Sequence, residues 1–593
     1  MDIKNTLIGL FFLASGIVVI YMQSQDLKDL EEAVDVQKLE SNSELIARDP
    51  GFVEEENDYA DSFKGAFQSV EDTTNALVST LAINQDEKLY TLENEYIQVK
   101  LTNKGGAIQQ IQFLKTKRGG LDDYIFNDGG IVPALGLSFE KQGRLQPLSF
   151  DYAVSSKTQE SIEFVYESAE NIKVVRRFSL NLSDEEPYLI QHETIIKNQG
   201  AEDLIFKNLY FNLGTTFPLS EKELPNYLSV GSFDGSDSKF TPINKLTSNG
   251  FLSNGSDERS DKTISRAGRF DWISQQNQYF VGMLLPSERA REVQINSVFS
   301  EGKLSAGISS NVAFAFDTVA SNESRSFKTG FYVGPKEFKR LQALGDSQDR
   351  VMQFGWFGFF SKLLLFIMTF IHGFIPNWGW SIVIMTILVK LIFWPLTGKA
   401  AESQKGMAKI QAPMAELKKK YENNPQKMQQ ETMRLFKEHG VNPLAGCLPI
   451  LIQMPIFLGL FYMLRTAAEL RYESFLWVSD LSQADTVAVI AGFPINLLPL
   501  LMGITMYFQM QITPVSPTAD PMQQKIFKFM PFIFLVFLYN FSSGLVVYWT
   551  TQNILTIIQT KMIHSKKAPT EVEDSSVLKA RPVKAKVNNV KKK

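Results

Sequence analysis

The feature that most constrains this chain is the segregation of its apolar residues. Long runs with few charges occupy residues 1–22 and roughly 356–564, whereas residues 23–350 are polar and mixed. The average composition, with 44% hydrophobic and 21% charged residues, would by itself fit an ordinary soluble protein. A soluble protein spreads its apolar residues along the chain, so the segregation predicts membrane-spanning helices joined to a large water-exposed domain.

Six segments are apolar enough to be interpreted as spanning helices. A helix needs about 20 apolar residues to cross the hydrocarbon core of a bilayer. The first segment, 6–22, is an uncharged run of 17. We interpret residues 1–22 as an uncleaved anchor rather than a cleaved signal peptide, because no A-x-A site follows. The other five predicted spans are 378–397, 444–464, 493–511, 527–541 and 545–563.

The stretch between the anchor and the remaining spans falls into two parts. Residues 23–85 hold 15 Asp and Glu against 4 Lys and Arg, which predicts a disordered acidic linker on the outer side. Residues 86–335 show period-two alternation, as at Ile97, Val99 and Leu101, with Gly, Asn, Asp and Ser between the runs. This pattern predicts an antiparallel β-sandwich. A carbohydrate-binding sandwich would look the same.

The connection at 336–376 contains a semi-amphipathic run rich in Phe and Trp. Arg350 and Lys362 interrupt its apolar surface. Helices of this kind lie in the plane of the membrane interface, so we expect an interfacial helix here. The alternative is a seventh spanning helix, which would put residues 23–350 on the same side of the membrane as the two basic segments described next.

Two basic segments determine the predicted orientation. The loop 399–442 holds nine Lys and Arg against five Asp and Glu, and the segment 561–593 holds ten against three. Basic segments stay in the cytoplasm, which places both chain termini inside and residues 23–350 outside. An outer domain of this size implies a periplasm and therefore a Gram-negative inner membrane. The tail 565–593 would bind anionic lipid head groups or RNA, as on a ribosome.

The loop 399–442 is predicted to form a cytoplasmic helical hairpin. Apolar residues recur in it at every third or fourth position, and Asn424 and Pro425 can begin a second helix. We expect the two helices to pack on each other, although a methionine-rich face also suits varied partners. The residues of the first stripe are Met407, Ile410, Met414, Leu417 and Tyr421.

Lys390 carries the clearest functional signal. A lysine inside an apolar span costs roughly 2.5–3.5 kcal/mol on insertion scales, so it is a functional candidate by default. A lysine that snorkels from near the helix end is the alternative. Other polar residues in or near the spans favour a wet cavity around the cation over scattered helix-to-helix hydrogen bonds. They are Thr386, Gln453, Thr505, Gln509, Thr550, Thr551, Gln552 and Asn553.

The sequence shows no sign of covalent or metal chemistry. Cys447 is the single cysteine, and the four histidines lie too far apart to form a local metal motif. No P-loop, GxSxG, HExxH or GxGxxG sequence stands in a suitable context. We therefore expect no catalytic residue, no metal and no cofactor, and a role in transport, binding or assembly rather than an enzyme.

Four segments of the membrane region closely resemble the YidC family of membrane protein insertases. They are NWGWSIVIMTILVKLIFWPLT (377–397), VNPLAGCLPILIQMPIFLGLFYML (441–464), DPMQQKIFKFMPFIFLVF (520–537) and SSGLVVYWTTQNILTIIQ (542–559). The segment YVGPKEF (332–338) and the outer domain resemble the Gram-negative members more loosely. The resemblance implies a polytopic α-helical membrane protein with six transmembrane helices, five of them in an insertase core at 377–564. A large periplasmic antiparallel β-sandwich domain completes the expected fold.

The resemblance also implies how the core works. A hydrophilic groove, open to the cytoplasm and to lipid, carries a positive charge that attracts the polar tail of a nascent inner-membrane protein. Lys390 matches this charge. The family usually has arginine at this position, and lysine lacks the planar set of N–H donors of the guanidinium group. Tyr548 and Trp549 match a position where the family commonly has two tyrosines. They join Met454 and Phe457 as expected client contacts at the groove mouth. Its expected polar lining is Thr386, Gln453, Thr505, Gln509, Gln552 and Asn553.

The predicted function is to insert inner-membrane proteins and help them fold, alone or with the Sec translocon. Ribosomes and membrane lipids are further expected partners. The alternative is a secondary transporter or channel with a periplasmic sensor domain, which predicts internal repeats that the five unequal spans do not show. A periplasmic carbohydrate-binding protein with a membrane anchor would need only one span.

Overall fold

The computed structural model describes part of the chain, and the following concerns that part only. It covers residues 87–565 except 116–121, 123, 131, 142–143, 169–170, 182–185, 205–207, 221–222, 248–261, 301–304, 317, 346, 423, 441–447, 491 and 513–520. The predicted anchor, the acidic linker and the basic tail from 566 onward lie outside the described residues.

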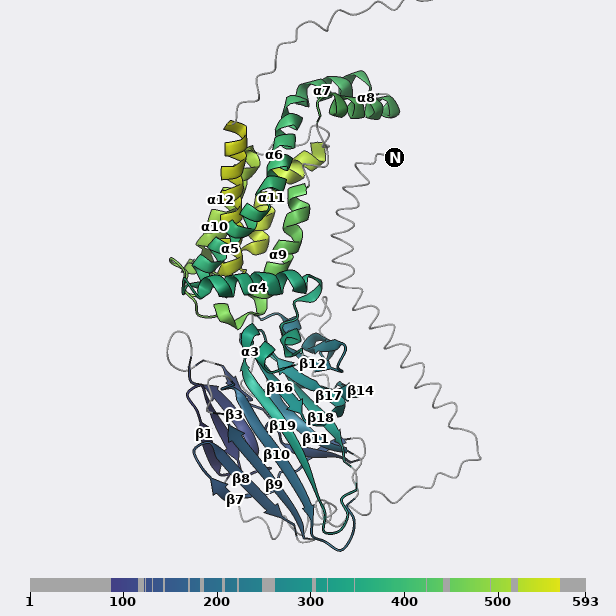
Figure 1. Ribbon diagram of the computed structural model, residues 1–593, viewed down its shortest axis with the longest axis vertical. Helices are drawn as coiled ribbons and strands as arrows, with labels where there is room; N and C mark the ends of the chain where they lie inside the picture. The colour runs from purple at the N-terminus through teal and green to yellow at the C-terminus, as the bar shows by residue number, and fades with distance from the viewer. Residues whose placement is uncertain are drawn as a thin grey trace, which may run out of the picture. The chain divides into compact units, whose positions relative to one another are not determined.

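Antiparallel strands dominate residues 89–335, as the alternation predicts (Figure 1). The largest sheet has the order β13-β12-β15-β16-β19-β10-β9-β8-β7. Its strands are β7 (Ala153–Lys157), β8 (Ser161–Glu167), β9 (Ile172–Leu180), β10 (Leu189–Asn198), β12 (Ser229–Phe233), β13 (Ser238–Pro242), β15 (Trp272–Gln276), β16 (Phe280–Pro286) and β19 (Ser324–Pro335).

Two further sheets complete this region. One has the order β14-β17-β18-β11-β5-β6 and the other β1-β2-β3-β4. Their strands are β1 (Leu89–Glu93), β2 (Ile97–Thr102), β3 (Ala107–Phe113), β4 (Ile125–Phe126), β5 (Leu137–Lys141), β6 (Arg144–Pro147), β11 (Asn208–Thr216), β14 (Thr263–Phe270), β17 (Ala290–Val298) and β18 (Gly307–Ala315). Strand β11 contacts β15 and β16 of the largest sheet, so the two larger sheets face each other as a sandwich.

The buried faces of the strands follow the sequence pattern. Ile97, Val99 and Leu101 on β2 are fully buried, while the residues between them are half-exposed. Gly105 and Gly106 turn the chain into β3 with φ values of +74° and +51°. Glycine enters this left-handed region without the steric penalty of a Cβ atom, so the turn can be tight.

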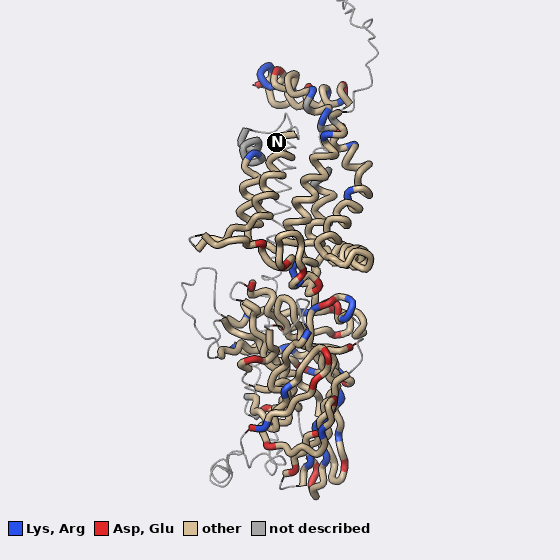
Figure 2. Tube along the Cα trace, turned by 90° about the vertical axis from the view of Figure 1, so that its left-hand side faces the viewer, with Lys and Arg blue, Asp and Glu red and all other residues tan. Residues whose placement is uncertain are grey.

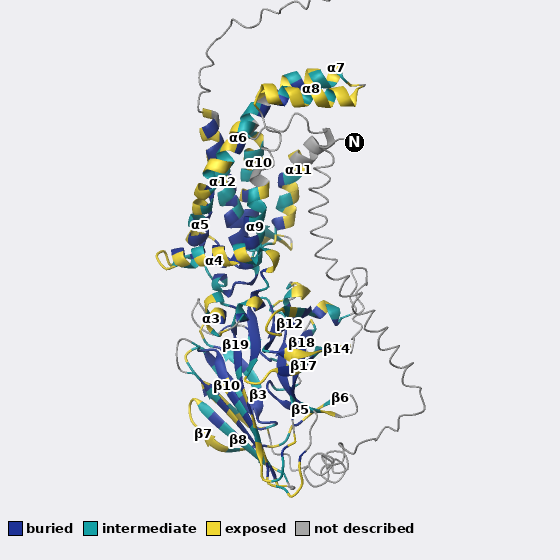
Figure 3. Cartoon of the chain, turned by 45° about the vertical axis from the view of Figure 1, so that its right-hand side comes forward, coloured by how far each residue is buried: buried dark blue, intermediate teal, exposed yellow. Residues whose placement is uncertain are grey.

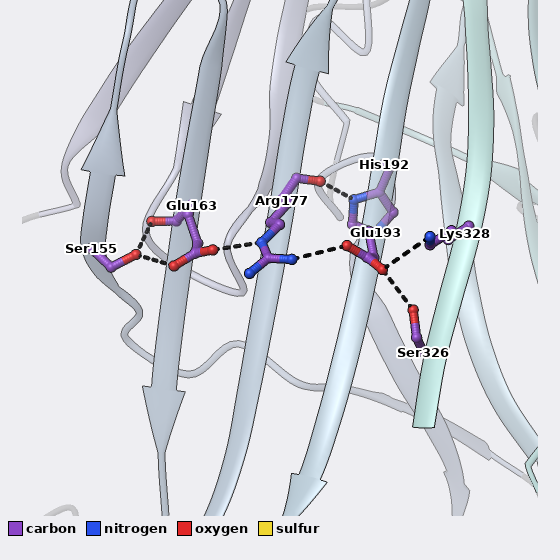
Figure 4. Close-up of polar contacts among 7 residues, drawn as sticks. All are labelled: Ser155, Glu163, Arg177, His192, Glu193, Ser326 and Lys328. Carbon is purple, nitrogen blue, oxygen red and sulfur yellow. Dashed lines mark hydrogen bonds and ion pairs between the residues drawn. The ribbon is translucent and has the colours of Figure 1, made fainter. Parts of the chain in front are cut away.

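A row of polar side chains crosses the exposed face of the largest sheet (Figure 4). The guanidinium of Arg177 on β9 pairs with Glu163 on β8 at 2.6 Å and with Glu193 on β10 at 3.2 Å. The hydroxyl of Ser155 and the guanidinium of Arg177 hold the pKa of Glu163 below its usual range. Exposed pairs of this kind contribute at most about 1 kcal/mol each, so the row helps fix strand register more than it stabilises the fold.

His192 lies on the buried side of the same strands. Its Nδ1 donates to the carbonyl oxygen of Arg177 at 3.1 Å (Figure 4). This leaves Nε2 to accept from Arg176 at 3.2 Å. Arg176 is fully buried and also donates to the carbonyl oxygen of Gly105 at 2.8 Å. Burial, and then the neighbouring guanidinium, lower the pKa of His192 well below 6.5, so the folded domain holds this ring neutral.

The second half of the described chain is helical. Helices α5, α9, α10, α11 and α12 run side by side, and α4 lies across one end of them (Figure 1). The helices are α3 (Phe338–Ala343), α4 (Gly358–His372), α5 (Trp378–Ile392), α6 (Trp394–Lys409), α7 (Gln411–Lys420), α8 (Pro425–Glu438), α9 (Leu448–Thr466), α10 (Leu497–Ile512), α11 (Pro521–Leu538) and α12 (Ser543–Ser565). A hairpin of β20 (Thr486–Ile490) and β21 (Phe493–Asn496) precedes α10.

Charge and exposure separate the bundle from its surroundings. Lys, Arg, Asp and Glu are sparse along the bundle and gather on α7, α8 and the β-sheets (Figure 2). The bundle also leaves many large apolar side chains exposed on its outer faces (Figure 3). Phe508 on α10 and Val536 on α11 are examples. Apolar surface of this extent is stable in contact with lipid rather than with water.

Two of the predicted spans are wrong in their bounds. The span predicted at 378–397 breaks at Phe393, where α5 and α6 meet at a bend of 64°. Pro395 explains the break, because it lacks an N–H donor and its ring clashes with the preceding turn. The span predicted at 493–511 begins only at Leu497, because residues 493–496 pair with β20 as strand β21.

Helix length alone does not establish six spans. By length and apolar composition, one described helix, Gly355–His372, can cross a membrane, and the bent pair of α5 and α6 qualifies as one broken span. Leu451–Thr466, Leu497–Ile512 and Lys528–Leu538 are shorter apolar helices. The qualifying helix contains α4, the segment predicted to lie in the interface.

Residues 467–485 link the sheets to the helical bundle. Arg471 forms a buried ion pair with Asp122 at 2.7 Å. The hydroxyl of Tyr279 donates to the carbonyl oxygen of Ser482 at 3.3 Å. A buried ion pair is costly to break because each charge would be left without its partner in a low-dielectric site. These contacts therefore connect the segment after α9 to the sheets.

We predict that His192 makes the stability of the sheets pH-dependent. The unfolded chain protonates this ring near pH 6.5, whereas the folded domain does not. Stability should be full above that pH and fall below it, by up to about 1.4 kcal/mol per pH unit. Thermal unfolding of the full chain from neutral to acidic pH measures this slope. His192→Gln should flatten the slope, and parallel slopes for the two proteins would contradict the prediction.

Candidate functional site

Polar side chains gather along α12, the last helix of the bundle. Each of four hydrogen-bonds to a different neighbouring helix, namely α9, α10, α5 and α6 in turn. A polar group inside an apolar bundle is costly unless a partner satisfies it, so these four contacts fix how the helices meet α12. The four residues, here called the α12 polar stripe, are Gln552, Asn553, Thr556 and Gln559.

Lys390 contacts the α12 polar stripe from the last turn of α5. Its side chain is buried, with the residue 6% exposed, and its Nζ donates to the hydroxyl oxygen of Thr556 at 2.9 Å. That hydroxyl donates its own hydrogen to the carbonyl oxygen of Gln552 at 2.8 Å, so its lone pairs remain available to the amine. Within the described part of the chain, no carboxylate lies close enough to act on Lys390.

Gln453, Tyr548 and Gln552 form a second polar contact, between α9 and α12. The side-chain amide of Gln453 donates to the hydroxyl of Tyr548. The amide of Gln552 donates in turn to the side-chain oxygen of Gln453 at 3.1 Å. Tyr548 is buried, whereas both glutamines are half-buried. The predicted polar residues Gln453 and Gln552 therefore meet, and Tyr548 joins them by its polar end.

A third contact joins α12 to α10. Asn553 donates to the hydroxyl of Thr505 at 3.2 Å and to the carbonyl oxygen of Met502 at 3.4 Å. Gln509 lies one turn further along α10 and is half-buried. Thr386 instead bonds within its own helix, because its hydroxyl donates to the carbonyl oxygen of Ile382 at 2.7 Å. The predicted polar residues thus form several small contacts along the bundle rather than one cluster.

An aromatic contact lies beside the polar ones. The ring of Trp549 packs edge-on against Phe457 of α9 at a centroid distance of 4.6 Å. It also packs against Phe534 of α11 at 4.9 Å. Met454 lies nearby in sequence on α9 and is half-buried. Trp549 therefore joins α9 and α11 across α12, with apolar surface on both sides.

The apolar stripe predicted in the loop 399–442 is largely buried within that loop. Met407, Ile410 and Met414 pack with Phe436 in a small core of their own. Leu417 is half-buried. The first stripe was predicted to lie on one helix, but it is divided between α6 and α7, which meet at Ile410. Asn424 caps α8 as predicted, accepting from the backbone N–H of Lys427 at 3.1 Å.

The structure adds functional candidates that the sequence interpretation missed. Thr556 is the partner of Lys390, and Gln559 donates to the hydroxyl of Thr397 at 2.8 Å. Thr556 lies one helical turn after Gln552, so its spacing placed it on the same face. Threonine is common in spanning helices because its hydroxyl can bond to its own backbone, and this explains why the signal was weak.

We predict that Thr556→Val destabilises the bundle through Lys390. The valine side chain has the same shape but accepts no hydrogen bond, so it leaves a buried cation without its partner at a cost of about 1–3 kcal/mol. The thermal unfolding temperature in detergent should fall, and Thr556→Ser should restore it. In a Lys390→Met background, Thr556→Val should have little further effect. Additive losses in the double variant would show that the two residues act independently.

Comparison with known proteins shows which proteins this chain resembles. The family model described as 60Kd inner membrane protein matches residues 370–570, and the model described as YidC periplasmic domain matches residues 89–367. A membrane protein insertase YidC from Endomicrobium trichonymphae is 32% identical over 486 residues, which cover 82% of this chain and 86% of that protein.

Solved structures with similar regions have low identity. The crystal structure of an active YidC insertase is 19% identical, covers 83% of this chain and 98% of that chain, and has a TM-score of 0.34. A galactose mutarotase-related enzyme from Lactobacillus acidophilus matches 42% of this chain and 97% of that chain, at 13% identity and a TM-score of 0.29. Membership follows from the family models and the insertase of Endomicrobium trichonymphae: the chain belongs to the YidC family of membrane protein insertases.

Proposed function

We propose that this protein inserts proteins into the bacterial inner membrane and helps them fold, without covalent chemistry. The single observation that carries the proposal is the buried cation of Lys390, bonded to a polar stripe inside an otherwise apolar bundle. The relatives are named insertases, and no observation favours the transporter or channel alternative. The clients would be nascent inner-membrane proteins.

The α12 polar stripe would lower the cost of moving a short polar segment across the membrane. Each unsatisfied polar group costs several kcal/mol in hydrocarbon. Gln453, Gln552 and Thr556 are only partly buried, so they can exchange their mutual hydrogen bonds for bonds to water or to a client. Lys390 would supply the positive charge that attracts an acidic or polar tail.

Short helices would lower the cost further by thinning the bilayer. Helix α10 has 16 residues, which corresponds to about 24 Å at 1.5 Å per residue. A typical hydrocarbon core is about 30 Å thick. Lipid next to a short helix thins or the helix ends snorkel, so a client beside α10 would cross a thinner barrier.

The aromatic contact would guide the apolar segment of a client. Trp549, Phe457 and Met454 present apolar surface next to the polar pair Gln453 and Tyr548. An amphipathic entrance of this kind accommodates the apolar segment on one side and the polar tail on the other. Methionine adds a flexible surface that adapts to clients of different shape.

We also propose the orientation expected from the charge distribution. Both termini and the hairpin of α7 and α8 would be cytoplasmic, and α4 would lie in the periplasmic interface. The position of α4 across the end of the bundle supports this, because its exposed face carries Phe359, Phe366 and Phe370 while Lys362 pairs with Asp349 (Figure 1). The Sec translocon, ribosomes and anionic lipids remain proposed partners.

We predict that Lys390 acts through its positive charge rather than through a specific geometry of hydrogen-bond donors. Lys390→Arg should keep activity, and Lys390→Met should impair clients with acidic tails by about 1–2 kcal/mol, because a hydrated site screens the attraction. Lys390→Glu should be the worst variant for acidic clients. Insertion into vesicles of one client carrying zero, one or two acidic residues measures the effect. An equal loss of insertion for all three client forms would contradict electrostatic attraction by Lys390 and would favour a structural role for this residue.

We predict that the hairpin of α7 and α8 captures clients through its outer surface. Its apolar stripe is buried against Phe436, so the exposed Lys419 and Lys420 and the half-buried Lys418 remain for contact. Deleting residues 411–438 should reduce crosslinking to stalled nascent chains. Changing the three lysines to alanine keeps the small core and should reproduce most of that loss. Full crosslinking after the deletion would contradict the prediction and would show that the hairpin only connects the flanking helices.

A further inference from the structure

The hairpin of β20 and β21 exposes apolar side chains to an unusual degree. Thr486 pairs with Asn496 and Ile490 pairs with Phe493, and all five residues of β20 are exposed. No Asp, Glu, Lys or Arg occurs between Asp485 and Asp520. The exposed large apolar side chains of the hairpin are Val487 (50%), Val489 (65%), Ile490 (64%) and Phe493 (57%).

The base of this hairpin is firmly attached, so the exposure is part of the fold. The amide of Asn496 donates to the carbonyl oxygen of Tyr539 at 2.7 Å. The hydroxyl of Tyr539 donates to the carbonyl oxygen of Pro494 at 2.6 Å, and its ring packs on Phe493 at 5.4 Å. The hydroxyl of Thr486 closes the base by donating to Asn496 at 2.7 Å. Both strands are therefore held in position beside the end of α11.

Water is an unfavourable surrounding for such a hairpin. Two strands without a third element are marginally stable alone, and exposed apolar strands with free edges tend to pair with other chains. The hydrocarbon core is equally unfavourable, because the free N–H and C=O groups of both edges would lack partners there. The interface between head groups and acyl chains satisfies both needs, since it hydrates the edges and accepts the apolar side chains.

The connections of the hairpin place it at that level. Helix α10 begins at Leu497, the residue directly after β21, and its exposed side chains Leu500, Leu501 and Ile504 are apolar. The hairpin follows the loop that begins where α9 ends, and there the hydroxyl of Thr466 donates to the carbonyl oxygen of Met352, just before α4. The apolar surface thus continues from α10 onto the hairpin, at the end of the bundle that carries α4.

We propose that the hairpin of β20 and β21 is a membrane anchor that inserts Val487, Val489, Ile490 and Phe493 into the outer-leaflet interface. Its partner is the lipid surface itself. The anchor would fix the depth of α10 and hold the outer end of the bundle at the head groups. The proposal rests on the membrane-spanning core of the proposed function, and the test below separates the two.

The experiment uses three single-cysteine proteins with a fluorescent probe whose emission depends on polarity. Each carries Cys447→Ser, plus Ile490→Cys at the hairpin, Ile504→Cys on α10 or Ser236→Cys in the exposed turn between β12 and β13. The full chain is reconstituted in vesicles that contain lipids with a nitroxide at the head group or along the acyl chain. Iodide serves as the quencher in water.

We expect the Ile490 probe to be quenched several-fold more strongly by head-group nitroxides than the Ser236 probe. Acyl-chain nitroxides should quench the Ile504 probe best. In one contradicting outcome, iodide quenches the Ile490 probe and lipid nitroxides do not, while lipid nitroxides still quench the Ile504 probe. The anchor proposal would then be wrong, but the membrane-spanning core would be supported. If neither probe responds to lipid, the spanning core itself is wrong. In another outcome, neither iodide nor lipid nitroxides quench the Ile490 probe, and the unlabelled Ile490→Cys protein forms disulfide-linked dimers. This would overturn the anchor proposal and show that a second copy of the chain covers the hairpin.

Discussion

The hydrogen bond between the amine of Lys390 and the hydroxyl of Thr556 is the interaction on which the helical bundle most depends. A cation among apolar helices must keep a partner, because transfer of an unpaired charge into a low-dielectric interior is costly. Thr556 supplies one acceptor, and water or a client can supply the others. The bond joins α5 to α12 through one of the three ammonium hydrogens, and in the proposed function the other two would serve a polar tail.

Helix α12 carries this arrangement because it contacts α5, α6, α9 and α10. Gln552, Asn553 and Gln559 bond to α9, α10 and α6, so a shift of α12 would disturb all of these contacts together. The outer faces of the bundle carry exposed apolar residues instead (Figure 3). The bundle thus carries polar side chains where α12 meets its neighbours and apolar side chains on its outer faces, the reverse of a soluble protein.

The two parts of the described chain use buried charge in different ways. In the sheets, Arg176 is fully buried and held by backbone carbonyl oxygens and a neutral His192, which fixes one arrangement of the interior. At the joint, the ion pair of Arg471 and Asp122 connects the segment after α9 to the sheets. Lys390 alone of these three cations contacts a side-chain hydroxyl that also lies at a partly exposed surface. This difference separates a structural charge from a candidate binding charge.

Local patterns in the sequence determined much of this protein. Alternation predicted the buried face of β2, Asn424 and Pro425 predicted the start of α8, and the apolar setting of Lys390 identified it before any contact was known. These features depend on residues within one or two turns or along one strand, so the sequence contains them directly. The family resemblance supplied the function, which no local pattern could.

Only the tertiary structure decided the pairings between distant segments. Thr556 lies 166 residues after Lys390, and Tyr539, which bonds to the hairpin of β20 and β21, lies 45 residues after its partner Pro494. The bend at Phe393 and the burial of Met414 against Phe436 likewise depend on how separate helices meet. Side-chain packing selects one such arrangement from many that the same periodicity allows, and this choice is made in three dimensions rather than along the chain.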